Sequence, residues 1–236
     1  MTDLDRRVYA IAGVGGALGP LVAARLAAAG ASVAGTDRSQ EVLDSVEAEL
    51  GIGERWDGRA VDLLDEGATR EWCAALVGRL GRVDGLIHLV GGWRGGEPLH
   101  EAPLADWELL HDLLVRTVQH TTRAFHDQIA ASPNGRFVLV SAKQAQAPSN
   151  TNAAYAAAKA AAEAWTLAFA DGFEPGGATA NIVVIDALLT PRMCEENPGK
   201  EFPTFTPAEQ VAEGIAFLCS DAGEKMNGQR LPLTMR

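Results

Sequence analysis

Short apolar runs alternate with longer segments in which apolar residues recur at helical spacing. The apolar runs predict strands at Val8–Ala12, Ser32–Thr36, Arg59–Leu63, Asp84–Val90, Gly135–Val140, Ala178–Ile185 and Arg230–Thr234. The segments between them predict helices at Leu21–Ala29, Gln40–Leu50, Glu66–Leu80, Leu104–Ala131, Asn150–Ala170 and Pro207–Ser220. This alternation predicts an α/β fold whose doubly wound sheet has about seven parallel strands.

A glycine-rich loop lies between the first predicted strand and the first predicted helix. Glycines in this place allow the backbone to approach a pyrophosphate, which binds at the N-terminus of the following helix. We therefore predict a Rossmann-type dinucleotide-binding unit. Its candidate contacts in the loop are Gly13, Gly15, Gly16, Ala17, Leu18 and Gly19.

Acidic residues follow the next two predicted strands. Asp37 comes about 20 residues after the glycine loop, where a carboxylate can accept hydrogen bonds from the ribose hydroxyls of adenosine. Asp37 would also repel the 2′-phosphate of NADPH, so we expect NADH to be favoured, although Arg38 could bind that phosphate. Asp62, beside Leu63, is either an adenine contact or a loop or helix-capping residue.

A second glycine-rich loop, Gly91-Gly92-Trp93-Arg94-Gly95-Gly96, follows the fourth predicted strand. Ligands of open α/β sheets bind at the carboxyl ends of the strands, so Val90, Gly91 and Gly92 are candidate cofactor contacts. Trp93 has two interpretations, a ring that stacks on a flat substrate or a lid residue that covers the core. We favour the contact with substrate.

One domain is expected over residues 1–236, because the chain has no internal repeat and no linker rich in proline, glycine or serine. Its dinucleotide-binding part should span about residues 7–140. The stretch 188–206 contains Pro191, Pro198 and Pro203 and breaks the helical pattern. Long irregular loops are often functional, so this stretch is predicted to be a substrate lid.

Composition narrows the choice of partners. The net charge of −11 and the pI of about 4.9 argue against nucleic acid or an anionic membrane, which leaves a small-molecule substrate. Cys73, Cys194 and Cys219 have no metal-binding spacing, so no metal is expected and a reducing, cytoplasmic location fits. Residues 1–7 are polar and charged and no apolar run reaches 18 residues, so neither a signal peptide nor a membrane span is expected.

Tyr155 and Lys159 lie in an alanine-rich stretch that is predicted to be helical. Their spacing of four residues places both side chains on one face of the helix. A nearby ammonium group favours the phenolate, so it should lower the pKa of Tyr155 towards the working range of a general acid or base. The alternative is a core tyrosine beside an unrelated surface lysine, but a nucleotide-binding chain makes a catalytic pair the better interpretation.

With these motifs in this order, the chain resembles the short-chain dehydrogenase/reductase family over essentially its whole length. The segment 12–19 looks like that family's Thr-Gly-x-x-x-Gly-x-Gly, with Ala12 in the threonine position and Ala17 in that of the middle glycine. The resemblance implies that the two aspartates contact ribose and adenine. It also implies that the tyrosine exchanges a proton with the substrate, while the lysine lowers the pKa of the tyrosine and binds the nicotinamide ribose.

Several positions depart from the family's pattern. The family's serine, 13 residues before the tyrosine, is Ala142 here, and Ser141 should point to the other side of its strand. The family's Asn-Asn-Ala-Gly is His88-Leu89-Val90-Gly91, and the asparagine of its proton relay is Leu114. Its Pro-Gly after the sixth strand is Ile185-Asp186.

These departures resemble the quinonoid dihydropteridine reductase branch of the family, which also lacks the serine. That branch shares the Gly-Gly-Trp-x-Gly-Gly loop, Ala-Lys after the fifth strand (Ala142-Lys143) and two Thr-Pro pairs (Thr190-Pro191 and Thr206-Pro207). Thr190 is a candidate cofactor contact. The candidate substrate contacts are Trp93, Ala142, Gln144 and Asn150.

The expected reaction is hydride transfer from NADH to a conjugated C=N system such as quinonoid dihydropterin, with Tyr155 as proton donor. A quinonoid pterin gains aromaticity on reduction and spreads the new charge over nitrogens, so it needs the missing serine less than a ketone does. Two alternatives stay open. One is the reduction of another ketone or imine in a specialised pathway, with Gln144 or Asn150 replacing the hydrogen bond of the serine. The other is a non-catalytic nucleotide-binding protein.

The resemblance also implies self-association. In the family, the helices that correspond to Leu104–Ala131 and to the helix with Tyr155 pair across a two-fold axis. Alanines on these helices allow close packing. We therefore expect a homodimer or a homotetramer built on this interface.

Overall fold

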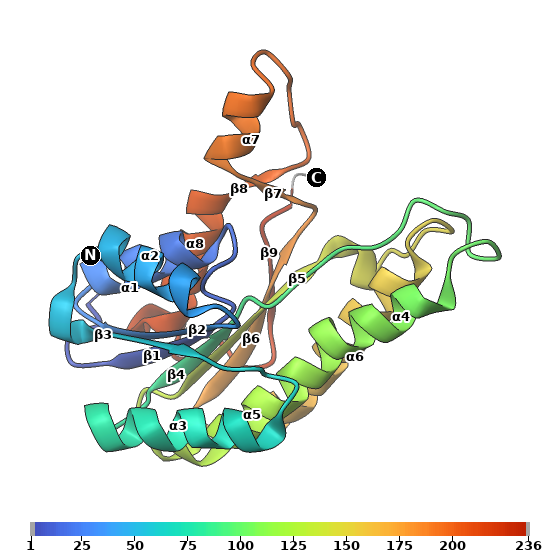
Figure 1. Cartoon of the computed structure of the whole chain (residues 1–236). Coiled ribbons are helices and arrows are strands. Elements are labelled where there is room, and N and C mark those ends of the chain that lie inside the picture. The colour runs from blue at the N-terminus through green and yellow to red at the C-terminus, as the bar shows by residue number, and fades with distance from the viewer. Residues whose placement is uncertain (1–2, 235–236) are drawn as a thin grey trace.

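A seven-stranded parallel sheet forms the centre of the computed structural model, which describes residues 3–234 (Figure 1). The order of its strands is β3-β2-β1-β4-β5-β6-β9. The strands are β1 (Val8–Ala12), β2 (Ser32–Asp37), β3 (Trp56–Ala60), β4 (Gly85–His88), β5 (Arg136–Ala142), β6 (Thr179–Ile185) and β9 (Arg230–Pro232). The predicted single-domain, doubly wound α/β fold is confirmed; residues 1–2 and 235–236 of the predicted domain lie outside the described residues.

Helices cover both faces of the sheet because its strands are apolar on both faces. One face packs against α1 (Gly19–Ala28), α2 (Gln40–Leu50) and α8 (Ala208–Cys219). The other packs against α3 (Glu66–Leu80), α5 (Thr117–Ala131) and α6 (Ala153–Asp171). Side chains alternate along β1, where Tyr9 and Ile11 belong to the first core and Ala10 and Ala12 to the second.

The helix predicted over 104–131 is continuous but changes its winding. It consists of α4 (Leu104–His111), a π-helical turn η2 (Asp112–Arg116) and α5. The hydroxyl of Thr117 donates a hydrogen bond of 2.6 Å to the carbonyl of Leu113 within this turn. Single π-helical turns often occur at functional sites, and this one borders the cavity described below.

The third strand is three residues earlier than the sequence pattern predicted. It spans Trp56–Ala60 instead of 59–63, with Trp56 paired to Val33 of β2. The indole of Trp56 is buried in the core, and its burial outweighs the apolar run around Val61. Residues 61–64 therefore leave the sheet and reach the ligand-binding edge.

The segment predicted as an irregular lid contains regular structure. Its ends pair as a two-stranded parallel sheet of β7 (Leu188–Leu189) and β8 (Thr206–Pro207), and it holds the short helix α7 (Pro191–Glu196). The rest of 188–206 has no regular structure, and Figure 1 shows the segment standing above the sheet. Its role as a lid stays a prediction.

Short 3₁₀ turns complete the fold at η1 (Gly53–Arg55), η3 (Lys143–Ala145) and η4 (Asp221–Gly223). Within residues 3–234, no helix combines the length and the apolar character that crossing a membrane requires. The same residues contain no group of three or more histidine, cysteine, aspartate or glutamate side chains placed to hold a metal ion.

Candidate active site

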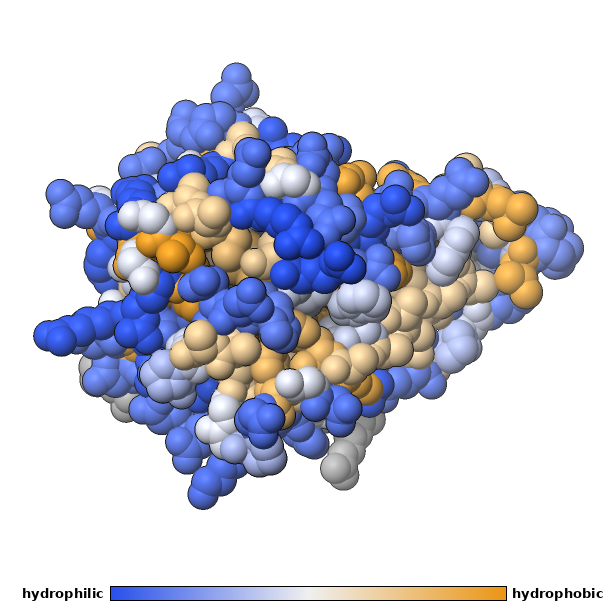
Figure 2. All heavy atoms as spheres, turned by 90° about the horizontal axis from the view of Figure 1, so that it is seen from below, coloured by the Kyte–Doolittle hydropathy of each residue, from blue (hydrophilic) through white to orange (hydrophobic). Residues whose placement is uncertain are grey.

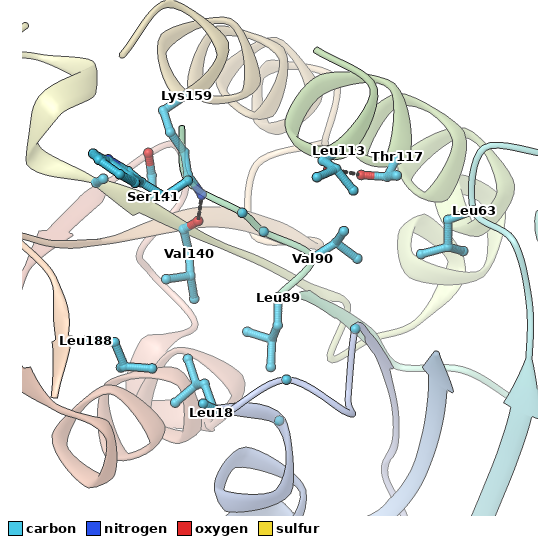
Figure 3. Close-up of a pocket in the computed structure, with 18 of the residues that line it drawn as sticks. Leu18, Leu63, Leu89, Val90, Leu113, Thr117, Val140, Ser141, Lys159 and Leu188 are labelled. Atoms are coloured by element: carbon cyan, nitrogen blue, oxygen red, sulfur yellow. Dashed lines mark hydrogen bonds between the residues drawn. The ribbon is translucent and has the colours of Figure 1, made fainter. Parts of the chain in front are cut away.

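A cavity of about 800 Å³ opens at the carboxyl ends of the parallel strands. Its lining comes from the loops after β1, β3 and β4, from the ends of β2, β5 and β6, and from η2, α5 and α6. Figure 3 shows Leu18 and Leu188 on one side of it, with Leu113, Thr117 and Lys159 on the other. This edge of the sheet is where open α/β folds bind their ligands.

The first glycine loop packs closely against its neighbours. Gly13 has a φ of +80°, and a Cβ there would lie 2.9 Å from the backbone nitrogen of Val90. A Cβ on Gly15 would lie 2.6 Å from Oδ2 of Asp37. Only glycine allows both approaches, and together they bring the loop, β2 and β4 to one side of the cavity.

The helix α1 begins at Gly19 without a side-chain cap on its first N–H groups. Leu18 is its N-cap residue, and both Leu18 and Gly19 line the cavity with Gly16 and Ala17. The Gly19 nitrogen donates to the Gly16 carbonyl and Pro20 has no N–H, so it is mainly the helix dipole at this end of α1 that favours a bound phosphate. The geometry of the loop and helix therefore fits a pyrophosphate.

Asp37 ends β2 and lies beside the glycine loop. Its Oδ1 accepts hydrogen bonds from the backbone nitrogens of Arg38, at 2.7 Å, and Ser39, at 3.4 Å. These bonds orient the carboxylate, which lines the cavity together with the exposed Arg38. Asp37, the predicted contact of the ribose, and Arg38, which could bind the 2′-phosphate of NADPH, are thus neighbours at the cavity.

Asp62 and Leu63 line the same end of the cavity. Asp62 lies in the turn after β3, where its Oδ1 accepts a hydrogen bond of 3.0 Å from the nitrogen of Leu64. It does not cap the next helix, because Asp65 is the N-cap of α3 and accepts from Ala68. Of the interpretations left open above, helix capping is therefore wrong and Asp62 is a loop residue, while the adenine contact stays a prediction.

Tyr155 and Lys159 line the cavity from the first turns of α6. The ammonium of Lys159 donates a hydrogen bond of 2.9 Å to the carbonyl of Val140 in β5 (Figure 3). Burial raises the pKa of the Tyr155 phenol to about 12. It also lowers the pKa of Lys159 to about 8, against the opposing effect of the Glu163 carboxylate. The expected lowering of the Tyr155 pKa is therefore wrong here, because loss of hydration dominates and the ammonium is bonded to β5.

Strand β5 ends with Ser141 and Ala142, whose side chains differ in what they can offer a ligand. Ala142 is buried and lines the cavity. The neighbouring Ser141 donates its hydroxyl proton to Oε1 of Glu163 on α6, at 2.7 Å. Because that proton is engaged, Ser141 has none left to offer an oxygen atom of a substrate.

The other predicted site residues divide into two groups. Val90, Gly91, Gly92, Trp93 and Gln144 line the cavity, with Trp93 58% exposed at its edge. Three predicted residues lie outside the lining set: Gly15, Asn150 and Thr190. Asn150 is exposed in the turn before α6, which begins at Ala153 instead of 150, and the Thr190 hydroxyl caps α7 by accepting from the Met193 nitrogen at 3.2 Å. Their predicted contacts stay untested.

Several residues that line the cavity were not identified from the sequence. Asp186, Ala187 and Leu188 follow β6 and line the cavity, and the rule that ligands bind at the carboxyl ends of strands could have found them. Lys143 and Asp186 also border an adjoining recess of about 540 Å³, where Nζ and Oδ1 lie 3.6 Å apart. No sequence signal indicated Thr117, which reaches the cavity through the packing of its helix.

His88 lies at the end of β4, behind the cavity wall. Its side chain is buried, and neither ring nitrogen has a hydrogen-bond partner among the described residues. Burial, and then the positive charge of Lys159, lower the pKa of His88 to about 3. The ring is therefore neutral near neutral pH.

Comparisons with known proteins match the chain over nearly its whole length. A family model described as enoyl-(acyl carrier protein) reductase matches residues 13–234. The 7alpha-hydroxysteroid dehydrogenase of Escherichia coli K12 is 26% identical over 98% of this chain and 94% of its own. The 3-oxoacyl-[acyl-carrier-protein] reductase of Thermotoga maritima is 29% identical over 96% and 95%. An NADPH-bound short chain oxidoreductase of Pseudomonas aeruginosa PAO1, described as containing an atypical catalytic center, has the same fold, with a TM-score of 0.89 at 24% identity over 98% and 96%.

Proposed function

Because the chain belongs to the short-chain dehydrogenase/reductase family of NAD(P)-dependent oxidoreductases, we propose that it transfers a hydride from NADH to a conjugated C=N substrate such as quinonoid dihydropterin. Tyr155 is the proton donor and Lys159 the residue that holds the nicotinamide ribose. The choice of substrate rests on one observation at the end of β5. Ala142 offers the cavity no hydroxyl, and the hydroxyl of the neighbouring Ser141 already donates a hydrogen bond to Glu163. The pterin branch itself rests on sequence motifs alone.

The cavity has the size and the polar groups that a dinucleotide needs. The glycine loop and the start of α1 would hold the pyrophosphate, and Asp37 the adenosine ribose. The bound nicotinamide would supply the hydride. The part of the cavity next to Tyr155 and Ala142 would then take the substrate.

Tyr155 is suited to giving a proton. Its pKa, raised to about 12, keeps the phenol protonated over the working pH range. A buried phenol donates its proton once negative charge grows on the substrate. The residues of this chain therefore fit the reductive direction.

Acceptor-dependent oxidation of NADH tests the proposal. We expect stoichiometric oxidation with quinonoid dihydropterin and less with simple ketones. Activity on ketones with none on the pterin would remove the branch assignment and leave the family assignment intact. NADH that binds but is oxidised by none of the pterins, ketones and imines would favour the non-catalytic alternative.

Reduction of a ketone is the second candidate, and Gln144 favours it. Its side chain lines the cavity, and its Oε1 is buried without a hydrogen-bond partner among residues 3–234. The same side chain carries an NH₂ group that could donate to a carbonyl oxygen in place of the missing serine. The two curated relatives named above are a hydroxysteroid dehydrogenase and an oxoacyl reductase, which suits such a substrate.

The substitution Ala142→Ser separates the two candidates. For a C=N substrate we expect no gain, and a loss of up to about tenfold in kcat/KM, because the added oxygen crowds a buried position. For a ketone the new hydroxyl should raise kcat/KM, since it stabilises the growing oxyanion. Parallel assays of wild type and variant with both substrate classes measure this, and a gain with the pterin would contradict the proposal.

Self-association is proposed from the surface around α4. Leu99, Leu104, Trp107 and Leu109 are exposed, Leu104 to 85%. Figure 2 shows apolar surface in orange and tan along the projecting arm of the molecule to which this region belongs. We expect light scattering at micromolar concentration to give the mass of a dimer or a tetramer, with C2 symmetry as the simplest arrangement. A single monomer mass would count against it.

A further inference from the structure

A buried carboxylate lies one helical turn beyond the proposed catalytic lysine. We propose that Glu163 is a positioning residue, anchored by Ser141 and Arg230, whose carboxylate acts through its charge on the ammonium of Lys159 one helical turn away. The inference rests on the hydride transfer proposed above, in which Lys159 holds the cofactor. The inference goes beyond that proposal because it assigns a role in cofactor binding to Glu163, a residue that does not line the cavity.

Every oxygen of the Glu163 carboxylate has a partner. Oε1 accepts the hydroxyl proton of Ser141 at 2.7 Å. Oε2 accepts from Nε of Arg230 at 2.6 Å, and from Nε2 of Gln146 at 3.5 Å. These partners come from β5, β9 and the residue after η3, and the Glu163 side chain is only 2% exposed. The carboxylate is thus held by three partners and kept out of water.

The register of α6 places this carboxylate beside the lysine. Lys159 and Glu163 are four residues apart on the face of α6 that packs against the sheet, together with Ala156, Thr166 and Ala170. Lys159 is 8% exposed, so both charges belong to the buried side of the helix. The Glu163 charge is consequently felt by Lys159 through protein and not through bulk water.

Stability alone does not require an ion pair at this position. Replacing a buried ion pair by well-packed apolar residues is often neutral or stabilising, because burying charge costs hydration energy. The ion pair in question is that of Glu163 with Arg230, whose side chain is 37% exposed. The presence of a charge at 163 is therefore better explained by its effect on Lys159.

The electrostatic effect of Glu163 has a definite sign. Burial lowers the pKa of Lys159, and the Glu163 carboxylate opposes that shift. Charged or titratable groups on the surrounding elements include Tyr155 on α6, neutral His88 on β4, His120 on α5, Lys143 on η3, Asp186 after β6 and Arg230 on β9. His120 and Lys143 have their own partners in the Leu63 carbonyl and Asp186, and Arg230 is bonded to Glu163. Removing the Glu163 charge should therefore leave Lys159 neutral at a lower pH.

Glu163→Gln tests this, because it keeps the size and an acceptor oxygen but removes the charge. We expect NADH affinity, measured by fluorescence titration, to match wild type at pH 6 and to fall up to about tenfold below it at pH 9, as for a shift of about one pKa unit. The alkaline limb of kcat/KM should move to lower pH by a similar amount. Glu163→Asp, which restores the charge, should restore both profiles.

Glu213→Gln is the matched control, since Glu213 pairs with Arg25 on the opposite face of the sheet and its side chain is 61% exposed. It should leave both pH profiles unchanged. Equal loss of NADH affinity at every pH in Glu163→Gln, checked against thermal unfolding at the same pH values, would reduce Glu163 to a structural role. An unchanged profile would overturn the inference as well. Because the binding assay needs no acceptor, its result stands even if wild type proves inactive on pterins, an outcome that would remove only the proposed substrate.

Discussion

Replacing Tyr155 by phenylalanine should lower turnover by about 10²–10⁴-fold while NADH binding stays close to wild type. The substitution removes the phenol oxygen and leaves the ring, which packs against a small buried cluster of Leu110, Leu114, Val115 and Ala158. Burial raises the pKa of this phenol to about 12, so the lost group is a protonated donor. Without it, the proton has to come from water, and the substrate charge is not stabilised as it forms.

Single-turnover oxidation of NADH, paired with a fluorescence titration for binding, separates these two effects. Tyr9→Phe is the matched control, because the chain has only two tyrosines and Tyr9 is buried far from the cavity lining. The Tyr9 hydroxyl donates to the Cys219 carbonyl at 2.7 Å, so its loss should cost about 1 kcal/mol of stability and leave turnover unchanged. Unchanged turnover in Tyr155→Phe would remove the catalytic assignment.

The kcat/KM for NADH should exceed that for NADPH by about 10²-fold. The Asp37 carboxylate lies at the end of β2 beside the glycine loop, where it would meet the 2′-phosphate of NADPH. Two like charges in contact cost several kcal/mol, and each 1.4 kcal/mol corresponds to about tenfold. Arg38 is exposed and offsets part of this repulsion without displacing the carboxylate.

Asp37→Asn should reduce this preference to within about tenfold, because it removes the charge and keeps an acceptor for the ribose hydroxyls. Adding Arg38→Gln to that variant should lower kcat/KM for NADPH again, which assigns the gain to the guanidinium. Steady-state kinetics with both cofactors and one acceptor measure the series. A wild-type enzyme that prefers NADPH would refute the assignment of Asp37.

The fold could be predicted because its determinants are local. The alternation of apolar strands with amphipathic helices follows from the residues within each element, as at Val8–Ala12 and Glu66–Leu80, which the structure reproduces without change. The glycine loop was recognisable for a similar reason, since Gly13 needs its positive φ whatever else surrounds it. The bounds of the third strand were predicted wrongly, because the burial of Trp56 against β2, and not the local apolar run, decides the register of this strand.

The identity of the chemical groups was also readable in the sequence. Tyr155 and Lys159 lie on one side of their helix because residues four apart do so in any helix, and Asp37 reaches the cavity because it is the last residue of its strand. The alanine at 142 needed no structure either. These residue types and their order were enough to indicate the family and the class of reaction.

The state of those groups depends on contacts between distant parts of the chain. Ser141 donates a hydrogen bond to Glu163, 22 residues further along the chain, and Glu163 in turn accepts one from Arg230, 67 residues further on. Lys159 bonds to the carbonyl of Val140, while burial raises the pKa of Tyr155 where the spacing alone predicted a lower one. Burial and charge are sums over everything that surrounds a side chain in space. The sequence therefore determined which chemical groups are present, and only the tertiary structure decided their hydrogen-bond partners, their burial and the resulting shifts of their pKa values.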